Sequence, residues 1–411
     1  MVDLRSLSAN SEMTIQVIQL LREMIAIPSV NPMRAGSGAA VERELVEYVE
    51  STLRRAGIDC ERQTVAEGRD NVFAVIHASG GRDTCDGLML NSHLDTVPVA
   101  NMSIDPFDPI VRDGRVYGRG ACDAKGSIAA MIAALVAHAN SPARPVPIVF
   151  AAMADEEFSF GGSWKLIERD WPVSACVVGE PTKLASIIAH KGVVRWLMSV
   201  TGTSAHGAMP HFGHSAIYDG ARIALALEAY AEELARRPAH SLLGQPTINV
   251  GRVTGGNAVN VVPDSCEFEV ERRLLPGEDG RQAVRDCEEW VRARVGGKIR
   301  LIVNEPYLVD PALDTPREAS VVRAVGDAHL SEFGSASAIE GAHYGTDGSK
   351  LAYAGIETVV CGPGDIAQAH TSDEFIEVRQ VEKAVRLYTR LVARWSPDFS
   401  GRHQEKLLKT D

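Results

Sequence analysis

The chain of 411 residues is longer than one hydrophobic core of ordinary size, so we expect two or three domains. Its composition, 45% hydrophobic and 23% charged, is typical of a globular protein. Lys and Arg number 42 against 54 Asp and Glu, the formal net charge is -12, and there is no sustained basic run. This balance argues against a nucleic-acid-binding protein, whose affinity requires cations clustered against phosphates.

The cysteines and the apolar stretches bear on the cellular compartment. Seven cysteines are scattered without a CxxC pair, which predicts neither a disulfide framework nor a cysteine-rich zinc site. The start of the chain, MVDLRSLSANSEM, lacks the charged and apolar regions of a secretory signal. The most apolar stretches, 128–136 and 146–154, are about half as long as a membrane span. We therefore expect a cytoplasmic protein without a membrane partner.

Apolar periodicity predicts helices and strands that alternate along most of the chain. Helical patterns cover 15–25, 41–56, 126–138 and 164–168. Short apolar runs that predict buried strands occur at 71–78, 87–93, 146–154, 174–179 and 357–362. Strands that alternate with helices predict an α/β layer with a mostly parallel sheet.

The stretch from about 191 to 305 has a different order of elements. A strand at 193–201 and a helix at 215–236 precede two strands joined by GGNAVNVVPDS, and a helix at 281–294 and a strand at 298–303 follow. This βαββαβ order predicts a small α+β domain inserted into the chain. We expect the main domain to comprise 1–190 and 306–411, with the inserted domain at 191–305.

Histidines and carboxylates follow the predicted strands, at the edge where an open α/β sheet binds its ligands. The set comprises His93, Asp95, Asp155, Glu156, Glu157, Glu180 and His370, and Asp123 lies in a loop before a helix. Any one of them alone could be a solvated loop residue, but their convergence at one edge indicates a metal site. Mixed imidazole and carboxylate ligands favour Zn²⁺ over Mn²⁺ or Co²⁺.

Local spacing suggests roles for some of these residues. In HLD, residues two apart on an extended segment face the same way, so Asp95 can accept a hydrogen bond from the far ring nitrogen of His93. In DEE, consecutive strand residues would point to opposite faces. Glu156 and Glu157 can therefore serve one site only where the chain has left the strand, one as a ligand and the other as a proton acceptor.

Six motifs in this order resemble the dinuclear zinc family of acetylornithine deacetylase and succinyl-diaminopimelate desuccinylase. They are NSHLDTVP, GRGACDAKG, ADEEFSFGG, GEPT, TSAHGAMPHFGHSA and AHTSDEF. The residues within these motifs, together with HKG at 190–192 and YGTDG at 344–348, are most similar to the acetylornithine deacetylase-like branch. The resemblance implies a zinc-exopeptidase-like catalytic domain with an inserted dimerisation or lid domain. It also implies a hydrolase of amino-acid metabolism, such as arginine biosynthesis.

The resemblance assigns roles residue by residue. His93 and Glu180 match the ligands of one metal ion, and Asp123 matches the aspartate that bridges two. Glu157 and His370 match the ligands of the second ion, and Glu156 matches the general base. Relatives commonly have a cis peptide after the bridging aspartate, here between Asp123 and Ala124. Each of the two divalent ions would then have three protein ligands, one of them shared.

Four further residues are expected to contact the substrate. His206 matches a family histidine that stabilises the oxyanion in the partner subunit's site, which implies a homodimer; alternatively, it is a surface histidine. Asn260 and Arg273 match positions that hold the substrate carboxylate, unless Arg273 pairs with a local acid such as Glu271. Thr346 is expected to form a pocket wall.

The predicted activity is hydrolysis of the amide of an N-acyl amino acid. An exopeptidase, either a carboxypeptidase or a dipeptidase, is the alternative, because a dipeptide contains the same type of bond. A non-catalytic binding protein is disfavoured, because no ligand or base is missing. Desuccinylases usually carry arginine where Val193 stands, so a shorter or uncharged acyl group is favoured.

Overall fold

The structure is a computed structural model that describes residues 11–33, 41–79 and 86–396. It divides into two compact units. Unit 1 comprises Met1–Ile188, Thr315–Glu340 and Thr346–Asp411, and unit 2 comprises Ala189–Asp314 and Gly341–Gly345. The six cysteines within the described ranges are free.

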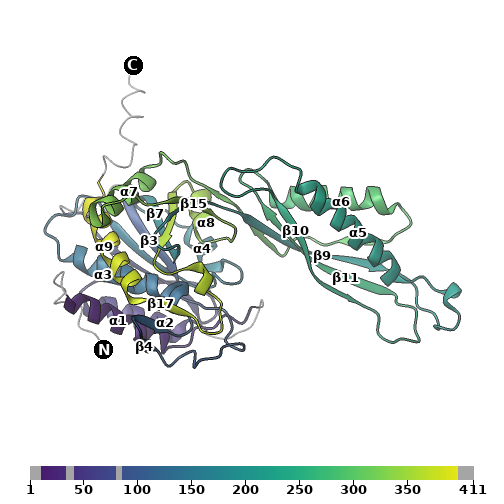
Figure 1. The fold of residues 1–411 in the computed structure, drawn as a ribbon, viewed down its shortest axis with the longest axis horizontal. Coiled ribbons are helices and arrows are strands. Elements are labelled where there is room, and N and C mark those ends of the chain that lie inside the picture. Colours follow the sequence, from purple (N-terminus) through teal and green to yellow (C-terminus); the bar gives the residue numbers. More distant parts are fainter. Residues whose placement is uncertain (1–10, 34–40, 80–85, 397–411) are drawn as a thin grey trace, which may run out of the picture. The chain divides into compact units, whose positions relative to one another are not determined.

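The larger sheet has nine strands in the order β1-β2-β6-β3-β7-β16-β8-β14, with β15 paired to β8. Most of it belongs to unit 1, whereas β14 and the last two residues of β8 and of β15 belong to unit 2. Strands β3, β7 and β15 are labelled in Figure 1. The four central strands of the sheet, β6, β3, β7 and β16, run parallel, and the pairs β1–β2, β2–β6, β8–β16 and β8–β14 are antiparallel. The strands are β1 (Cys60–Ala66), β2 (Arg69–Ile76), β3 (Gly87–His93), β6 (Ile148–Met153), β7 (Val173–Pro181), β8 (Ser186–His190), β14 (Leu313–Asp314), β15 (Ile339–Ala342) and β16 (Glu357–Gly362). Strands β3, β6 and β7 are buried at every residue, as expected of strands covered on both faces. The prediction of a mostly parallel α/β sheet is therefore confirmed.

Helices cover this sheet, and a small sheet packs beside it. Helix α3 packs against β3, β6 and β7 and against α9, and α7 packs against α9 and β16. The helices are α1 (Ser11–Ile25), α2 (Arg43–Arg55), α3 (Gly126–Ala139), α4 (Gly161–Leu166), α7 (Ser320–Phe333), α8 (Gly348–Tyr353) and α9 (Val378–Arg394). A three-stranded sheet contains β4 (Ile110–Arg112), β5 (Arg115–Tyr117) and β17 (Phe375–Glu377). This small sheet pairs the segment that precedes α3 with the segment that precedes α9.

One helical segment of unit 1 is apolar enough to resemble a membrane span. Residues 121–139 satisfy the length and composition of such a span, but 94% of the segment's apolar window is buried inside the structure. Helix α3 is an alanine- and isoleucine-rich helix without Asp, Glu, Lys or Arg, and the sheet and α9 surround it. These contacts explain its apolar composition as that of a central core helix.

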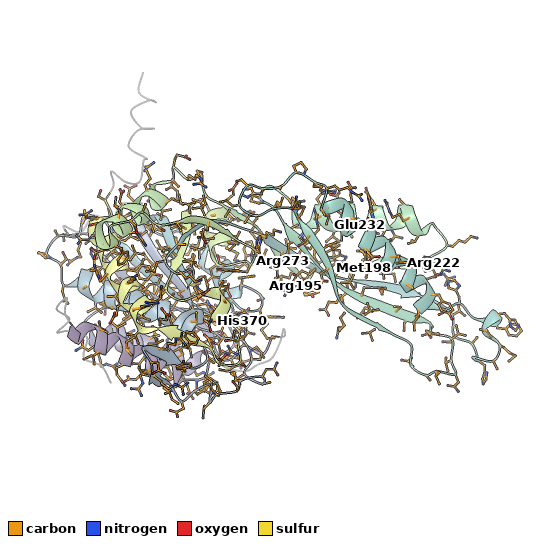
Figure 2. The ribbon with its side chains drawn as sticks, viewed as in Figure 1. Arg195, Met198, Arg222, Glu232, Arg273 and His370 are labelled. Atoms are coloured by element: carbon orange, nitrogen blue, oxygen red, sulfur yellow. The ribbon has the colours of Figure 1, made fainter. Side chains whose placement is uncertain are left out.

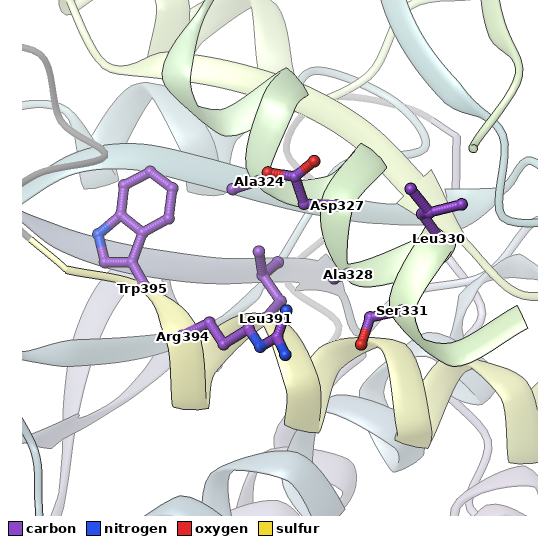
Figure 3. A pocket seen from close by; sticks show the side chains of 8 residues that line it. All are labelled: Ala324, Asp327, Ala328, Leu330, Ser331, Leu391, Arg394 and Trp395. Atoms are coloured by element: carbon purple, nitrogen blue, oxygen red, sulfur yellow. The ribbon is translucent and has the colours of Figure 1, made fainter. Parts of the chain in front are cut away.

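A surface groove lies between α7 and α9 (Figure 3). It has a volume of about 450 Å³. Its lining residues are Ala324, Asp327, Ala328, Leu330, Ser331, Leu391, Arg394 and Trp395. None of the residues predicted to bind metal or substrate lines this groove.

Unit 2 is a five-stranded sheet with two helices. The sheet runs β10-β11-β9-β12, with β13 also paired to β9, and all of its pairs are antiparallel. Its elements are β9 (Gly192–Thr201), α5 (Ala216–Leu234), β10 (Thr247–Gly255), β11 (Ser265–Leu274), α6 (Gly280–Val295), β12 (Leu301–Val303) and β13 (Leu308–Asp310). Burial alternates along β9 and β11, because one face of the sheet packs on α5 and α6. The order of elements is the predicted βαββαβ, extended by β13.

Candidate metal centre

The carboxyl ends of the parallel strands of unit 1 carry the predicted ligands. His93 is the last residue of β3, and Glu180 lies near the end of β7. Glu157 lies in the turn after β6, and His370 follows β16 and a short 3₁₀ helix. Asp123 lies in a tight turn before α3, and the peptide bond between Asp123 and Ala124 is cis, as expected. The sheet therefore brings ligands from five segments to one edge.

His93, Asp123 and Glu180 form a first donor set. The Nε2 atom of His93 lies 2.9 Å from Oδ1 of Asp123 and 3.7 Å from Oε1 of Glu180. The other ring nitrogen, Nδ1, donates a hydrogen bond of 2.9 Å to the backbone carbonyl of Asp95. This hydrogen bond fixes the ring and leaves the Nε2 lone pair directed at the two carboxylates.

Asp123, Glu157 and His370 form a second donor set. The Nε2 atom of His370 lies 3.2 Å from Oδ2 of Asp123 and 3.4 Å from Oε2 of Glu157. His370 has a positive φ of 60° and a half-exposed side chain, and Figure 2 shows it on unit 1. Asp123 belongs to both sets through its two different oxygens. The donor atoms within each set lie within 4.8 Å of one another.

The donor chemistry fits bound cations. Among the described residues, every ion pair of these three carboxylates has a histidine as its partner. Oε1 of Glu157 and Oε1 of Glu180 are buried and lack a hydrogen-bond partner. Buried carboxylate oxygens are costly unless they are paired or bound to metal, so the site suits positive charge. Oxygen and imidazole donors together suit Zn²⁺ and related divalent ions.

The pKa shifts of these groups also indicate a site that suits a cation. Burial raises the pKa of Glu180 to about 8 and also raises the pKa of Glu157. Hydrogen bonds to Asp123 and Glu157 raise the pKa of His370 to about 10, although burial opposes this shift. Burial alone would raise the pKa of Asp123, but His370 and His93 hold it below its usual range. The raised pKa values of Glu157, Glu180 and His370 favour bound protons where a metal ion could supply positive charge instead.

Glu156 and Asp95 lie next to these donor sets. Strand β6 ends at Met153, so the chain has left the strand before the two glutamates. Burial raises the pKa of Glu156 well above its usual value, with neighbouring carboxylates adding to the shift. The Asp95 carboxylate accepts hydrogen bonds from the backbone N–H groups of Glu156 and Glu157, at 3.0 and 3.1 Å. Its Oδ1 lies 3.7 Å from Nδ1 of His93, which is too long for the hydrogen bond that the HLD spacing predicted.

Glu374 is a functional candidate that the sequence reasoning missed. Its fully buried carboxylate accepts hydrogen bonds from the N–H groups of Gly120, Cys122 and Asp123. It also pairs with Arg119 at 2.7 Å. The Glu374 carboxylate therefore holds the turn that presents Asp123. Its position in the AHTSDEF motif, four residues after His370, was the available signal.

The residues predicted to contact substrate lie in three different places. In unit 2, the loops of His206 and Asn260 are adjacent, because the N–H of Gly207 donates to the Asn260 carbonyl at 2.7 Å. Arg273 lies at the opposite end of β11 and bonds to Glu271 at 2.8 Å, which is the local pairing that the sequence left open. Arg195 bonds to the other carboxylate oxygen of Glu271. Arg195 and Arg273 are both labelled in Figure 2. In unit 1, Thr346 is buried in the turn before α8.

Comparison with known proteins identifies the family. Residues 89–394 match the model of peptidase family M20/M25/M40. Acetylornithine deacetylase from Myxococcus xanthus is 33% identical over 362 residues, covering 85% of this chain and 91% of that protein.

Two solved structures share the fold. An M20 family metallo-carboxypeptidase from Sulfolobus solfataricus has a TM-score of 0.73 at 17% identity, covering 92% of this chain and 99% of that one. A dinuclear metal-binding peptidase of the M20 family from Bacillus subtilis has a TM-score of 0.69 at 16% identity, with coverages of 93% and 98%. The expected family resemblance is confirmed: the chain belongs to peptidase family M20/M25/M40 and is a metal-dependent hydrolase that acts on amide bonds.

Proposed function

We propose that this hydrolase removes the acyl group from an N-acyl amino acid at a dinuclear metal centre. The observation that carries the proposal is the pair of donor sets that share Asp123, with the buried Glu156 beside them. The sequence similarity to acetylornithine deacetylase supports a deacylase in particular. Val193, buried on β9, supplies no charge to bind a succinyl carboxylate, which favours a short or uncharged acyl group.

Two divalent ions are proposed to occupy the donor sets, with zinc favoured over cobalt and manganese. His93 and Glu180 would hold one ion, Glu157 and His370 the other, and Asp123 both. Bound there, the ions would polarise the amide carbonyl and lower the pKa of a water molecule at the site.

Glu156 is proposed to move the proton. Its carboxylate takes a proton from the attacking water as the new C–O bond forms, and it gives this proton to the amine as the C–N bond breaks. Burial makes Glu156 a stronger proton acceptor than an exposed glutamate. Asp95 holds the backbone of Glu156 while this happens, through the hydrogen bond to its N–H group.

His206 is proposed to donate to the oxyanion, and Arg273 and Asn260 to bind the substrate carboxylate. Strand β11 separates the loop end of unit 2 from Arg273 by about eight residues, roughly 25 Å of extended chain. A small substrate cannot span this length, so His206 and Arg273 of one chain cannot both bind one substrate molecule. Asn260 lies beside His206 and is equally far from Arg273 of its own chain. We therefore assign both His206 and Asn260 to the site of a second subunit in a homodimer, where Asn260 of one chain and Arg273 of the other would bind the same carboxylate.

The surface of unit 2 supports this assembly. Strand β10 is an edge strand of its sheet. Apolar side chains near it and on α5 are exposed, namely Phe212, Ile217, Tyr218, Leu225, Val253, Val259 and Val261. Exposed apolar groups beside an open edge favour association with another chain. A two-fold contact would bury the same patch on both subunits.

The test is a substrate panel assayed with the purified enzyme at defined metal content. N-acetylornithine, other N-acetyl amino acids and dipeptides are compared by kcat/KM. We expect a preference for an N-acyl amino acid, whereas a preference for dipeptides would establish the exopeptidase alternative. Glu156→Gln should lose most of the activity and retain both metal ions. Glu168→Gln, on an exposed residue of the same unit, is the matched control.

A further inference from the structure

A buried charge cluster lies behind the turn that carries Glu156 and Glu157. It consists of Asn31, Glu42, Arg69, Asp95 and Asp155, all at most 8% exposed. Arg69 is its cation. Two of the three acids, Glu42 and Asp155, have no role in the proposed metal sets or in proton transfer. Burying such charges costs free energy. The contacts of the cluster therefore point to the segments that it keeps in position.

Arg69 joins two of the acids through separate edges of its guanidinium group. Its Nη1 lies 2.7 Å from Oδ1 of Asp155, and its Nε donates to Glu42 at 2.9 Å. Glu42, just before α2, also accepts from the backbone N–H of Asp155 at 3.3 Å. A planar fork can satisfy both carboxylates together, whereas the single ammonium group of lysine cannot do so with the same geometry.

Asn31 connects this pair to the site. Its Nδ2 atom donates to Oδ2 of Asp95 at 2.8 Å and to Oδ1 of Asp155 at 2.9 Å. The Asp95 carboxylate in turn accepts hydrogen bonds from the backbone N–H groups of Glu156 and Glu157. The turn therefore has its first residue, Asp155, held by Arg69 and its next two residues held by Asp95.

The conformation of the turn explains why it needs these contacts. Asp155 has a φ of 63°, a left-handed conformation that is unfavourable for a residue with a side chain. Without Arg69, the carboxylates of Glu42, Asp95 and Asp155 would be buried together and would repel one another. Asp155 would then tend to leave this conformation, and both glutamates would change direction.

We propose that Arg69 is a positioning residue for this amide hydrolysis: through Asp155, Asn31 and Asp95 it sets the directions of Glu156 and Glu157. This inference rests on the proposed roles of those two glutamates. Arg69 itself touches neither the substrate nor the metal donors. Its effect is transmitted by the backbone of the turn.

The test compares Arg69→Met and Arg69→Lys with Arg62→Met. Arg62 is a matched control, because it also extends from the β1–β2 hairpin to a glutamate of α2, Glu50, but lies at the surface. We expect Arg69→Met to lower kcat by roughly 100-fold with KM changed less than about threefold, as for a displaced catalytic group. Arg69→Lys should recover part of the loss, and Arg62→Met should leave kcat unchanged.

Two measurements do not depend on turnover. Hydrogen exchange of the metal-free protein should show faster exchange at the amides of Glu156 and Glu157 in Arg69→Met than in Arg62→Met. Competition with a chelator should show that one of two zinc equivalents binds about 10- to 100-fold more weakly. If Arg69→Met does not fold, Asn31→Ala, which leaves the Arg69 ion pairs in place, should show the same changes.

The outcomes separate this inference from the proposed function. A folded Arg69→Met protein with unchanged kcat, exchange and zinc affinity would overturn the positioning role. Full activity in Glu156→Gln would instead overturn the proposed base, whatever Arg69 does. Equal loss of kcat in Arg62→Met and Arg69→Met would also contradict the inference, because it would indicate general destabilisation of the hairpin.

Discussion

The proposed metal donors of unit 1 and the proposed substrate residues of unit 2 are held in contrasting ways. Four of the five proposed ligands are mostly buried, and the Nδ1 hydrogen bond of His93 orients its ring. His206 and Asn260 instead lie on exposed loops, and within the described part of the chain the Arg273 side chain pairs only with the partly exposed Glu271. The fold of unit 1 thus places the two donor sets in advance, while the proposed substrate residues of unit 2 have little that fixes them within one chain.

This difference shows how the two sets of residues are positioned. Ligands at the carboxyl ends of packed strands are placed by the fold of one unit. Groups on exposed loops need a second surface to define their geometry, and we propose that substrate or another subunit supplies it here. Four predictions test this contrast, from the largest expected effect to the smallest.

Replacing Asp123 should have the largest effect, because it belongs to both donor sets. Asp123→Ala should weaken binding of both ions by more than the roughly 10- to 100-fold typical of residues beyond the ligands, and amide hydrolysis should fall to background. Metal content after dialysis and kcat/KM measure this. Asp113→Asn, at an exposed loop carboxylate, is the control. Retention of two tightly bound ions by Asp123→Ala would contradict the shared-ligand assignment.

Replacing His206 should reduce kcat without loss of metal. Removal of an oxyanion donor lowers kcat by roughly 10²- to 10³-fold, so His206→Ala should show this loss with two ions still bound. Mixing it with Glu156→Gln should restore activity, up to roughly a quarter of wild type for random dimers with one intact site per heterodimer. No recovery despite demonstrated subunit exchange would place His206 within its own site or outside catalysis.

Arg273 should affect substrate binding more than turnover. Loss of a charge-assisted hydrogen bond should raise KM by roughly 10- to 100-fold in Arg273→Met and change kcat little. Arg195→Met is the matched control, since Arg195 bonds to the same carboxylate of Glu271. Equal effects in the two variants would mean that Arg273 only completes this local ion pair.

His138 provides a contrast with the histidines of the candidate metal site. Burial, aided by Arg144, lowers its pKa to about 4, whereas nearby carboxylates raise that of His370. The unfolded state therefore binds more protons between pH 6.5 and 4, and stability is lost as the pH falls through this range. His138→Gln should reduce that loss by at most ~1.4 kcal/mol per pH unit. Urea denaturation of metal-free protein across this range measures it; identical pH dependence would contradict the shift.

Much of the fold could be predicted from periodicity. The continuously apolar strands β3, β6 and β7 and the helix α3 have clear sequence patterns, and so does the alternation of β9 and β11. Short strands such as β4, β13 and β14 were missed, because two or three residues carry no measurable period. Their pairing depends on contacts that are distant in sequence.

The candidate site, too, could be predicted from the sequence only in part. The positions of His93, Glu157 and Glu180 at the ends of apolar runs were enough to predict that they converge. The Arg69 cluster could not be predicted, because its members come from separate segments and no local pattern marks a buried ion pair. Nδ1 of His93 bonds to the backbone carbonyl of Asp95 and not, as predicted, to its carboxylate. The Asp95 carboxylate instead faces the turn after β6, where it accepts the N–H of Glu156.

Diffraction data from zinc-loaded crystals, collected on both sides of the zinc absorption edge, test the central claim most directly. The account predicts two anomalous peaks per chain, one bound by His93 and Glu180, the other by Glu157 and His370, with Asp123 bound to both. A single peak, or peaks bound by other residues, in crystals of fully active enzyme would contradict it.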